Sequence, residues 1–260
     1  MTRKYIFFDI DGTLTDLDSG EVPQSAFDAI RKLEENGHFC CIATGRAHYK
    51  SESVREALGF KNMISNGGYC FTIDGKVVKN APLRREQALA LVKQADELGM
   101  GVLVSPDDSI DVVCRDEKFV EQVGLRREPT RYFLRRDMAW EDLPDFYKLY
   151  IACPPEREKE LTLLDTLGHI RFVPPYIIFQ HDSKDKGIRD MVAMLGGDTK
   201  DVIVFGDGEN DMCMFGQEWT SVAMRSGYEP LKEMADYITD APIDNGIYNA
   251  CVHFGLIDND

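Results

Sequence analysis

Residues 5–14, which read YIFFDIDGTL, decide the fold. The first four are continuously apolar, a pattern typical of a strand buried on both faces of a parallel sheet. Two aspartates, Asp9 and Asp11, follow directly and are separated by one residue. In an open parallel sheet, ligands bind beyond the carboxyl ends of the strands, so both carboxylates are expected at a binding site. Gly12 then lets the chain turn sharply.

These two aspartates also have a simpler interpretation, as residues that form a turn or cap a helix. We favour a functional interpretation of Asp9 and Asp11. An apolar strand seldom ends in two unpaired carboxylates, because burying them without a partner is costly.

The segments that follow alternate between helix and strand. A helical pattern begins at Pro23 and ends at Gly37, a buried strand follows at Phe39–Ala43, and a second helix reaches about Leu58. This βαβα order predicts an α/β fold with a Rossmann-like, doubly wound parallel sheet.

The pattern is then interrupted and later resumed. Short strands that pair locally and are flanked by helices predict a separate α+β unit at residues 82–181. The parallel pattern returns with a helix predicted from Lys186 to Leu195 and a buried strand at Val202–Phe205. We therefore predict a core domain of residues 1–81 and 182–260, with an α+β domain inserted into it.

Composition limits the classes of partner. The chain has 260 residues and a formal net charge of −15, which disfavours nucleic acid and anionic membranes as partners, although it also simply promotes solubility. Its seven cysteines form no CxxC pair, which suggests buried thiols in a reducing compartment. The N-terminus does not resemble a signal peptide, and no run approaches the ~20 apolar residues of a membrane span. We expect a soluble, cytoplasmic protein.

Three further segments fall where the same site is expected. These segments are Thr44-Gly45-Arg46 after a strand, Lys186-Gly187 at the predicted start of a helix, and the strand-end sequence GDGEND at residues 206–211. Each also has a plain structural interpretation: the first as a helix cap, the second as a surface lysine and the third as a polar loop.

Together these motifs resemble a known family. The order DxDGT, TGR, KG and GDGEND is similar to that of the haloacid dehalogenase superfamily of phosphohydrolases. An insertion between the second and third motifs resembles the Cof-like phosphatase branch of that superfamily, which carries a large α/β cap. The chain departs from that branch at Arg225-Ser226, where members often have a glycine and an asparagine.

The resemblance implies a two-step mechanism. Asp9 would attack phosphorus and form an aspartyl phosphate, and Asp11 would protonate the leaving alcohol and then activate water. Asp11 would need to hold a proton near neutral pH, which crowding by other carboxylates would favour.

The resemblance also implies a Mg²⁺ cofactor and a phosphoryl-binding set. The metal would be held by Asp9, Asp207 and the backbone carbonyl of Asp11, and Asp211 would hold a metal-bound water. The residues implied to bind the phosphoryl oxygens are Ile10, Thr44, Gly45, Lys186 and Asn210. The substrate would be a small phosphorylated metabolite, such as a sugar phosphate, covered by the inserted domain. An arginine cluster in that domain (Arg126, Arg127, Arg131, Arg135 and Arg136) is either a solvated face or a site for a second anionic group.

Other functions fit some of the same residues. A phosphomutase of the same superfamily would use the same aspartate pair. A phospho-receiver domain also gathers acidic residues, a threonine and a lysine around Mg²⁺, but such domains are about half this length. A non-catalytic binding module would be favoured if a catalytic carboxylate were missing, and none is.

Overall fold

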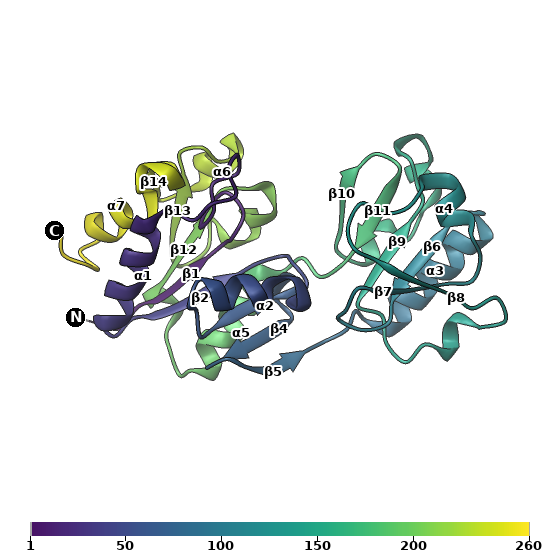
Figure 1. Ribbon diagram of the computed structural model, residues 1–260, viewed down its shortest axis with the longest axis horizontal. Coiled ribbons are helices and arrows are strands. Elements are labelled where there is room, and N and C mark those ends of the chain that lie inside the picture. Colours follow the sequence, from purple (N-terminus) through teal and green to yellow (C-terminus); the bar gives the residue numbers. More distant parts are fainter. Residues whose placement is uncertain (1, 260) are drawn as a thin grey trace. The chain divides into compact units, whose positions relative to one another are not determined.

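Figure 1 shows the computed structural model of the chain, which describes residues 2–259. The chain divides into two compact units. One contains the residues up to Lys79 and from Ser183 onwards, and the other contains Asn80–Asp182. The sequence-based division put the insertion at residues 82–181. Among the described residues, no helix is both long and apolar enough to cross a membrane.

The first unit is built on an eight-stranded sheet, in which the six strands from β14 to β3 run parallel. In spatial order the strands are β14 (Tyr237–Thr239), β13 (Thr220–Met224), β12 (Val202–Gly206), β1 (Tyr5–Phe8), β2 (Phe39–Ala43), β3 (Met63–Ser65), β4 (Cys70–Ile73) and β5 (Lys76–Asn80). Its α-helices are α1 (Gln24–Glu35), α2 (His48–Ala57), α5 (Lys184–Met194), α6 (Glu229–Met234) and α7 (Gly246–His253). The predicted doubly wound α/β core is confirmed.

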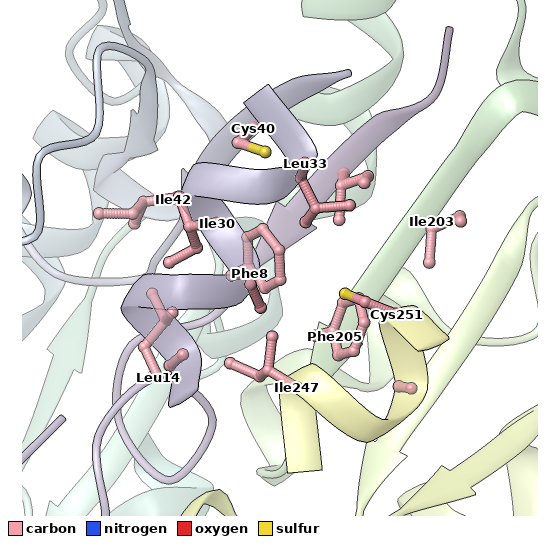
Figure 2. Packing of buried hydrophobic residues seen from close by; sticks show 14 of the residues in the cluster. Phe8, Leu14, Ile30, Leu33, Cys40, Ile42, Ile203, Phe205, Ile247 and Cys251 are labelled. Carbon is pink, nitrogen blue, oxygen red and sulfur yellow. The ribbon is translucent and has the colours of Figure 1, made fainter. Parts of the chain in front are cut away.

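Side chains of β1 alternate between two hydrophobic cores, and this explains its unbroken apolar sequence. Ile6 and Phe8 pack into the core beneath α1 and α7, whereas Tyr5 and Phe7 pack into the core that contains side chains of α5 and α6. Figure 2 shows the first of these cores, where the Phe8 ring stacks on Phe205 of the neighbouring strand with centroids 4.9 Å apart. A strand covered on both faces has no polar face to present.

The second unit is a mixed six-stranded sheet with apolar clusters on both faces. The sheet order is β10 (His169–Val173), β11 (Tyr176–Phe179), β9 (Lys148–Ile151), β6 (Val102–Ser105), β7 (Asp111–Cys114) and β8 (Arg131–Leu134). Helix α3 (Arg85–Glu97) contributes to one cluster, and α4 (Lys118–Val123) contributes Phe119 to the other. Only β7 and β8 pair in parallel; the other pairs are antiparallel, as expected of an α+β unit.

Helix α5 begins two residues earlier than the sequence analysis predicted. Its first helical residue is Lys184 rather than Lys186, and Ser183 precedes it. The buried positions of the helix are Lys184, Gly187, Ile188, Met191 and Val192. This i, i+3, i+4, i+7, i+8 spacing is the inward stripe of an amphipathic helix, so the first lysine of the helix lies on the inward face.

A turn at Asn66–Gly68 fixes the start of α5. The Ser183 N–H donates to the Gly67 carbonyl at 2.9 Å, and Gly187 comes so close that a Cβ there would lie 2.7 Å from the Gly68 Cα. Gly68 has a φ of 101°, and a Cβ on it would collide with the Ser183 carbonyl oxygen. The turn also donates to the segment that follows β2: the Asn66 N–H donates to the Arg46 carbonyl at 2.8 Å.

Gly68→Ala is expected to destabilise the protein strongly, because the new Cβ meets backbone that cannot move aside. Gly59→Ala is the matched control, since Gly59 also has a positive φ, of 74°, but has open space around it. We expect about 1–2 kcal/mol for the control and about 2 kcal/mol more for Gly68→Ala, measured by urea unfolding. Equal losses would show that the contact with Ser183 is not constraining.

Candidate active site

The site forms where three neighbouring parallel strands end. The register pairs Phe8 of β1 with Phe205 of β12 and with Ile42 of β2. Asp9 follows β1 directly, Asp207 follows β12, and Thr44 follows β2. Parallel strands end at the same edge of a sheet, so segments nearly two hundred residues apart in sequence are brought together. The carboxylates of Asp9, Asp207 and Asp211 offer ligand atoms that all lie within 4.8 Å of one another.

A buried lysine joins two of these carboxylates. The Lys184 ammonium donates to Asp9 Oδ1 at 2.7 Å and to Asp211 Oδ1 at 2.6 Å. The Lys184 side chain is only 1% exposed, so both ion pairs are shielded from water. Burial alone would lower the pKa of Lys184, but the charges of Asp211 and Asp9 outweigh it and hold that pKa above its usual range.

Asp207 is held from the β1 side. The Thr13 hydroxyl donates to Asp207 Oδ1 at 3.0 Å. Gly12, with a φ of 81°, passes so close that a Cβ at this position would overlap the Asp207 carboxylate. The glycine of the DxDGT motif is therefore required both for its backbone conformation and for the space that Asp207 occupies.

Asp211 organises the loop that carries Asp207. Its Oδ2 accepts the backbone N–H groups of Asp207 and Gly208, each at 3.0 Å, while its Oδ1 accepts Lys184. Both oxygens of Asp211 are thus engaged within the protein. Among residues 2–259, by contrast, the second oxygens of Asp9 and Asp207 accept no hydrogen bond.

The cluster carries more negative charge than the protein neutralises. Burial raises the pKa of Asp9 to about 7; Asp211 adds to the rise and Lys184 opposes it. Burial, followed by the charge of Asp211, also raises the pKa of Asp207 to about 7, although the Thr13 hydrogen bond opposes this. Three carboxylates share one ammonium, so a cation between Asp9 and Asp207 would offset the excess charge.

The residues present fit a small divalent cation. Carboxylate oxygens are hard ligands, and an octahedral ion with bonds of about 2.1 Å brings its ligands to within about 3–4 Å of one another. The spacing of the three carboxylates agrees with this, and Asp9 and Asp207 each keep one oxygen without a hydrogen bond in the described chain. Asp211, engaged at both oxygens, is suited to hold the loop rather than the ion directly.

Asp11 stands apart from the buried cluster and pairs with an arginine. Arg46 Nε donates to Asp11 Oδ2 at 2.9 Å, and its Nη2 donates to Asp11 Oδ1. The Asp11 side chain is 51% exposed, whereas Asp9 and Asp207 are buried. In place of the predicted crowding by other carboxylates, the structure puts the Arg46 guanidinium against both Asp11 oxygens.

The structure brings Lys184 to the cluster rather than the predicted Lys186. Lys186 lies on the solvent side of α5, where its ammonium contacts Asp190 one helical turn later, and it does not reach the cluster. Lys184, which sequence analysis missed, takes the inward position. Two residues apart on a helix are about 200° apart around its axis, so only one lysine of Lys184-Asp185-Lys186 can face the sheet. Extending the apolar stripe of Ile188 and Met191 backwards by one turn would have identified Lys184.

The remaining predicted phosphoryl-binding residues lie at the same strand ends. Thr44 is buried and its Oγ1 accepts the Arg46 N–H at 3.1 Å, and Gly45 is partly exposed beside it. The Ile10 side chain is fully buried and the Ile10 carbonyl accepts the Leu14 N–H. The group of Ile10 that could donate a hydrogen bond to an anion is therefore its backbone N–H. Asn210 is exposed on the loop after β12.

Three arginines of the predicted cluster are paired within the second unit. Arg126 packs its guanidinium 3.9 Å from the centroid of the Tyr150 ring, and its side chain is largely buried. Arg131 makes two 2.7 Å bonds to Asp111, and Arg136 contacts Glu117 at 3.2 Å. These pairings favour a structural role and a solvated face over a shared anion site.

Comparison with known proteins agrees with this geometry. Residues 6–251 match the family of haloacid dehalogenase-like hydrolases. The chain belongs to this family. YkrA of Bacillus subtilis (strain 168), which carries the name of a phosphatase, is 31% identical over 259 residues that span 99% of this chain and all of YkrA.

Solved structures also match this hydrolase over nearly its whole length. A hypothetical protein from Geobacillus kaustophilus HTA426 is 31% identical, with a TM-score of 0.81 over 98% of this chain and all of the other. The subclass IIB sugar phosphatase BT4131 is 25% identical, with a TM-score of 0.72 over 98% of this chain and all of its own. The hydrolase is thus an enzyme of the Cof-like phosphatase branch, as the four motifs suggested.

Lys184→Met should destabilise the hydrolase by about 3–5 kcal/mol at pH 8 in EDTA, because it leaves Asp9 and Asp211 buried without their counter-ion. Lys186→Met is the matched control and should cost less than about 1 kcal/mol, since it removes only a surface ion pair. Urea unfolding measures both. Similar losses in the two variants would contradict the buried bridge.

Asp207→Asn should stabilise the metal-free hydrolase at high pH. The pKa of Asp207 rises from 3.8 to about 7 on folding, so the folded wild type loses stability as pH increases between these values and is penalised most above pH 7. An asparagine keeps the Thr13 bond and removes the charge. We expect the substitution to raise the free energy of unfolding by about 2 kcal/mol at pH 8, and this gain should fade towards pH 4. Thermal unfolding in EDTA measures it.

The exposed substitution Asp18→Asn is the control for that experiment and should show no such pH dependence. Adding Mg²⁺ at pH 8 should raise the Tm of the wild type and of the control but not of Asp207→Asn. A wild type that is indifferent to divalent cations would contradict the proposed role of this carboxylate.

Proposed function

We propose that this hydrolase is a Mg²⁺-dependent phosphatase that removes phosphate from a small phosphorylated metabolite, such as a sugar phosphate, through an aspartyl phosphate on Asp9. The observation that carries the proposal is the convergence of Asp9, Asp207 and Asp211 around one buried lysine. The sugar phosphatase BT4131 and YkrA support the same class of reaction. The phosphatase names of YkrA and BT4131 favour hydrolysis over the phosphomutase alternative.

Asp9 is suited to act as the nucleophile. Lys184 fixes one of its oxygens at 2.7 Å, which orients the carboxylate and leaves the second oxygen without a hydrogen bond among residues 2–259. In the first step an oxygen of Asp9 forms a bond to phosphorus as the bond to the leaving alcohol breaks. Holding the carboxylate rigidly removes much of the entropic barrier to in-line attack.

Asp11 is proposed as the acid and then the base. It gives a proton to the leaving alcohol oxygen in the first step and takes one from water in the second, when that water attacks phosphorus and releases Asp9 and inorganic phosphate. The pair with Arg46 occupies both Asp11 oxygens, so it must open before the first proton transfer. Arg46 is thus placed to control when Asp11 becomes available.

The phosphoryl oxygens are proposed to lie between the ends of β1 and β2. Thr44 and the Gly45 N–H would bind them from β2, Ile10 through its N–H, and Asn210 from the loop after β12. Lys184 replaces Lys186 in this set, because only Lys184 contacts Asp9.

Mg²⁺ would be held by the carboxylates of Asp9 and Asp207 together with the Asp11 carbonyl, and Asp211 would keep the Asp207 loop in place. When bound, the ion would neutralise charge that develops on the phosphoryl group. Residues 80–182 are proposed as the cap domain that the family implies.

Asp9→Asn should lower kcat for hydrolysis of 4-nitrophenyl phosphate by roughly a thousandfold or more, because an amide is a far weaker nucleophile. The substitution keeps an oxygen for Lys184, so the fold should persist. EDTA should silence the wild type and Mg²⁺ should restore it. Asp18→Asn, an exposed change of the same kind, is the control. Full activity in Asp9→Asn would refute the covalent mechanism.

A further inference from the structure

The turn at Asn66–Gly68 has an unusual backbone. Its φ angles are all positive, at 50° for Asn66, 56° for Gly67 and 101° for Gly68. Positive φ is easy for glycine but uncommon for other residues, and asparagine is among the few that tolerate it. Backbone of this kind persists where the surrounding contacts hold it, and it concentrates at functional sites.

The left-handed conformation directs two successive amides to one neighbouring segment. The Asn66 N–H donates to the Arg46 carbonyl at 2.8 Å, and the Gly67 N–H donates to the Thr44 carbonyl at 3.3 Å. In an extended strand, successive N–H groups point to opposite sides, whereas in a helical turn they point the same way. Both bonds therefore end on the segment after β2, where the phosphoryl oxygens are proposed to bind.

These bonds orient the amide of Gly45. Thr44 uses both its backbone groups on the β3 side, since its N–H donates to the Ile64 carbonyl at 2.9 Å and its carbonyl accepts Gly67. The Thr44–Gly45 peptide is trans, so the Gly45 N–H points the opposite way, towards the β1 side of the segment. Among residues 2–259 this N–H donates no hydrogen bond, and a Cβ on Gly45 would meet open space. The Gly45 amide is thus free to bind an anion at the strand ends.

The same turn fixes the approach of Lys184. The Gly67 carbonyl accepts the Ser183 N–H at 2.9 Å, and Ser183 directly precedes Lys184. The Lys184 ammonium in turn donates to Asp9 at 2.7 Å. Gly67 therefore donates to the segment that carries the Gly45 amide and accepts from the segment that carries Lys184. The backbone of one residue sets the spacing of two groups proposed to bind the phosphoryl oxygens.

We propose that the Asn66–Gly68 turn positions the transferring phosphoryl group, and that Asn66 is the positioning residue within it. This inference rests on the proposed function and adds a role for a turn that the proposed mechanism does not use. The turn matches the Gly45 N–H to the Lys184 ammonium, so that both donate to one phosphoryl group. Asp207 of the proposed metal site is held separately, by the Thr13 hydroxyl at 3.0 Å.

The test measures the Kd of orthovanadate, an oxyanion that mimics the phosphoryl group, by isothermal titration calorimetry in saturating Mg²⁺. Asn66→Thr introduces a β-branched side chain that disfavours positive φ, so the Asn66 and Gly67 amides should turn away from the segment after β2. We expect the Kd to rise about tenfold or more, because the oxyanion donors lose their fixed orientation.

Asn66→Gly should restore tight binding, to within about threefold of the wild-type Kd, because glycine adopts positive φ without strain. Neither variant keeps the amide side chain, so the comparison isolates the backbone. Asn66→Ala adds no atom beyond the Cβ already present and should give an intermediate Kd, which keeps the test decisive if Asn66→Thr does not fold.

Asp74→Thr is the matched control, because Asp74 has a φ of 48° but lies in the exposed turn between β4 and β5. It should lower the free energy of unfolding in urea and leave the orthovanadate Kd unchanged. The Mg²⁺ concentration that gives half of the full rise in Tm should stay within about twofold of wild type in every variant, because Asp207 has its own support.

Equal Kd values in Asn66→Gly and in the folded Thr or Ala variants would overturn the positioning role and leave the phosphatase intact. An equal loss of Mg²⁺ affinity in those variants, or a weaker Kd in Asp74→Thr, would also overturn it, because either would indicate a general disturbance of the fold. A wild type that neither binds orthovanadate nor hydrolyses 4-nitrophenyl phosphate would refute the proposed function, and this inference with it.

Discussion

The ion pairs of Lys184 are the interaction on which the site depends. A lysine with 1% exposure is stable inside a protein only if carboxylates compensate for its lost hydration, and Asp9 and Asp211 do so from opposite parts of the chain. The same contacts also stabilise the two carboxylates. Two buried carboxylates that would repel each other are held near one ammonium, and each is fixed in orientation by it. The bridge thus joins β1, the start of α5 and the loop after β12 into one unit.

Close backbone packing makes this bridge possible. Lys184 reaches the cluster because α5 begins against the Asn66–Gly68 turn, where Gly68 and Gly187 leave no room for side chains. Asp211 reaches back to the Asp207 and Gly208 amides, and a Cβ on Gly206 would lie 2.8 Å from the Asp211 Cβ. Small residues at these points let the charged groups approach one another. A more loosely packed loop would allow the like-charged carboxylates to move apart.

The site has two environments, and the division between them matches the proposed division of chemical tasks. Asp9 is buried and rigidly bonded, as a nucleophile that must meet phosphorus in line should be. Asp11, two residues later, is half exposed and pairs with Arg46, as suits the proposed acid that must reach a leaving alcohol. β1 ends at Phe8 and the chain turns sharply at Gly12, which has a φ of 81°, so Asp9 and Asp11 do not follow the alternation of a regular strand and one short motif can serve both environments.

The sequence by itself determined the family, the doubly wound core and the carboxylates at the ends of β1 and β12. These follow from local patterns: unbroken apolar strands, glycines beside aspartates, and the order of four motifs. Tertiary structure alone decided which lysine enters the cluster and that Arg46 holds Asp11. These depend on the rotation of α5 about its axis and on contacts between segments distant in sequence. A two-residue shift in the predicted start of α5 was enough to select Lys186 in place of Lys184, because each residue turns the helix by about 100°.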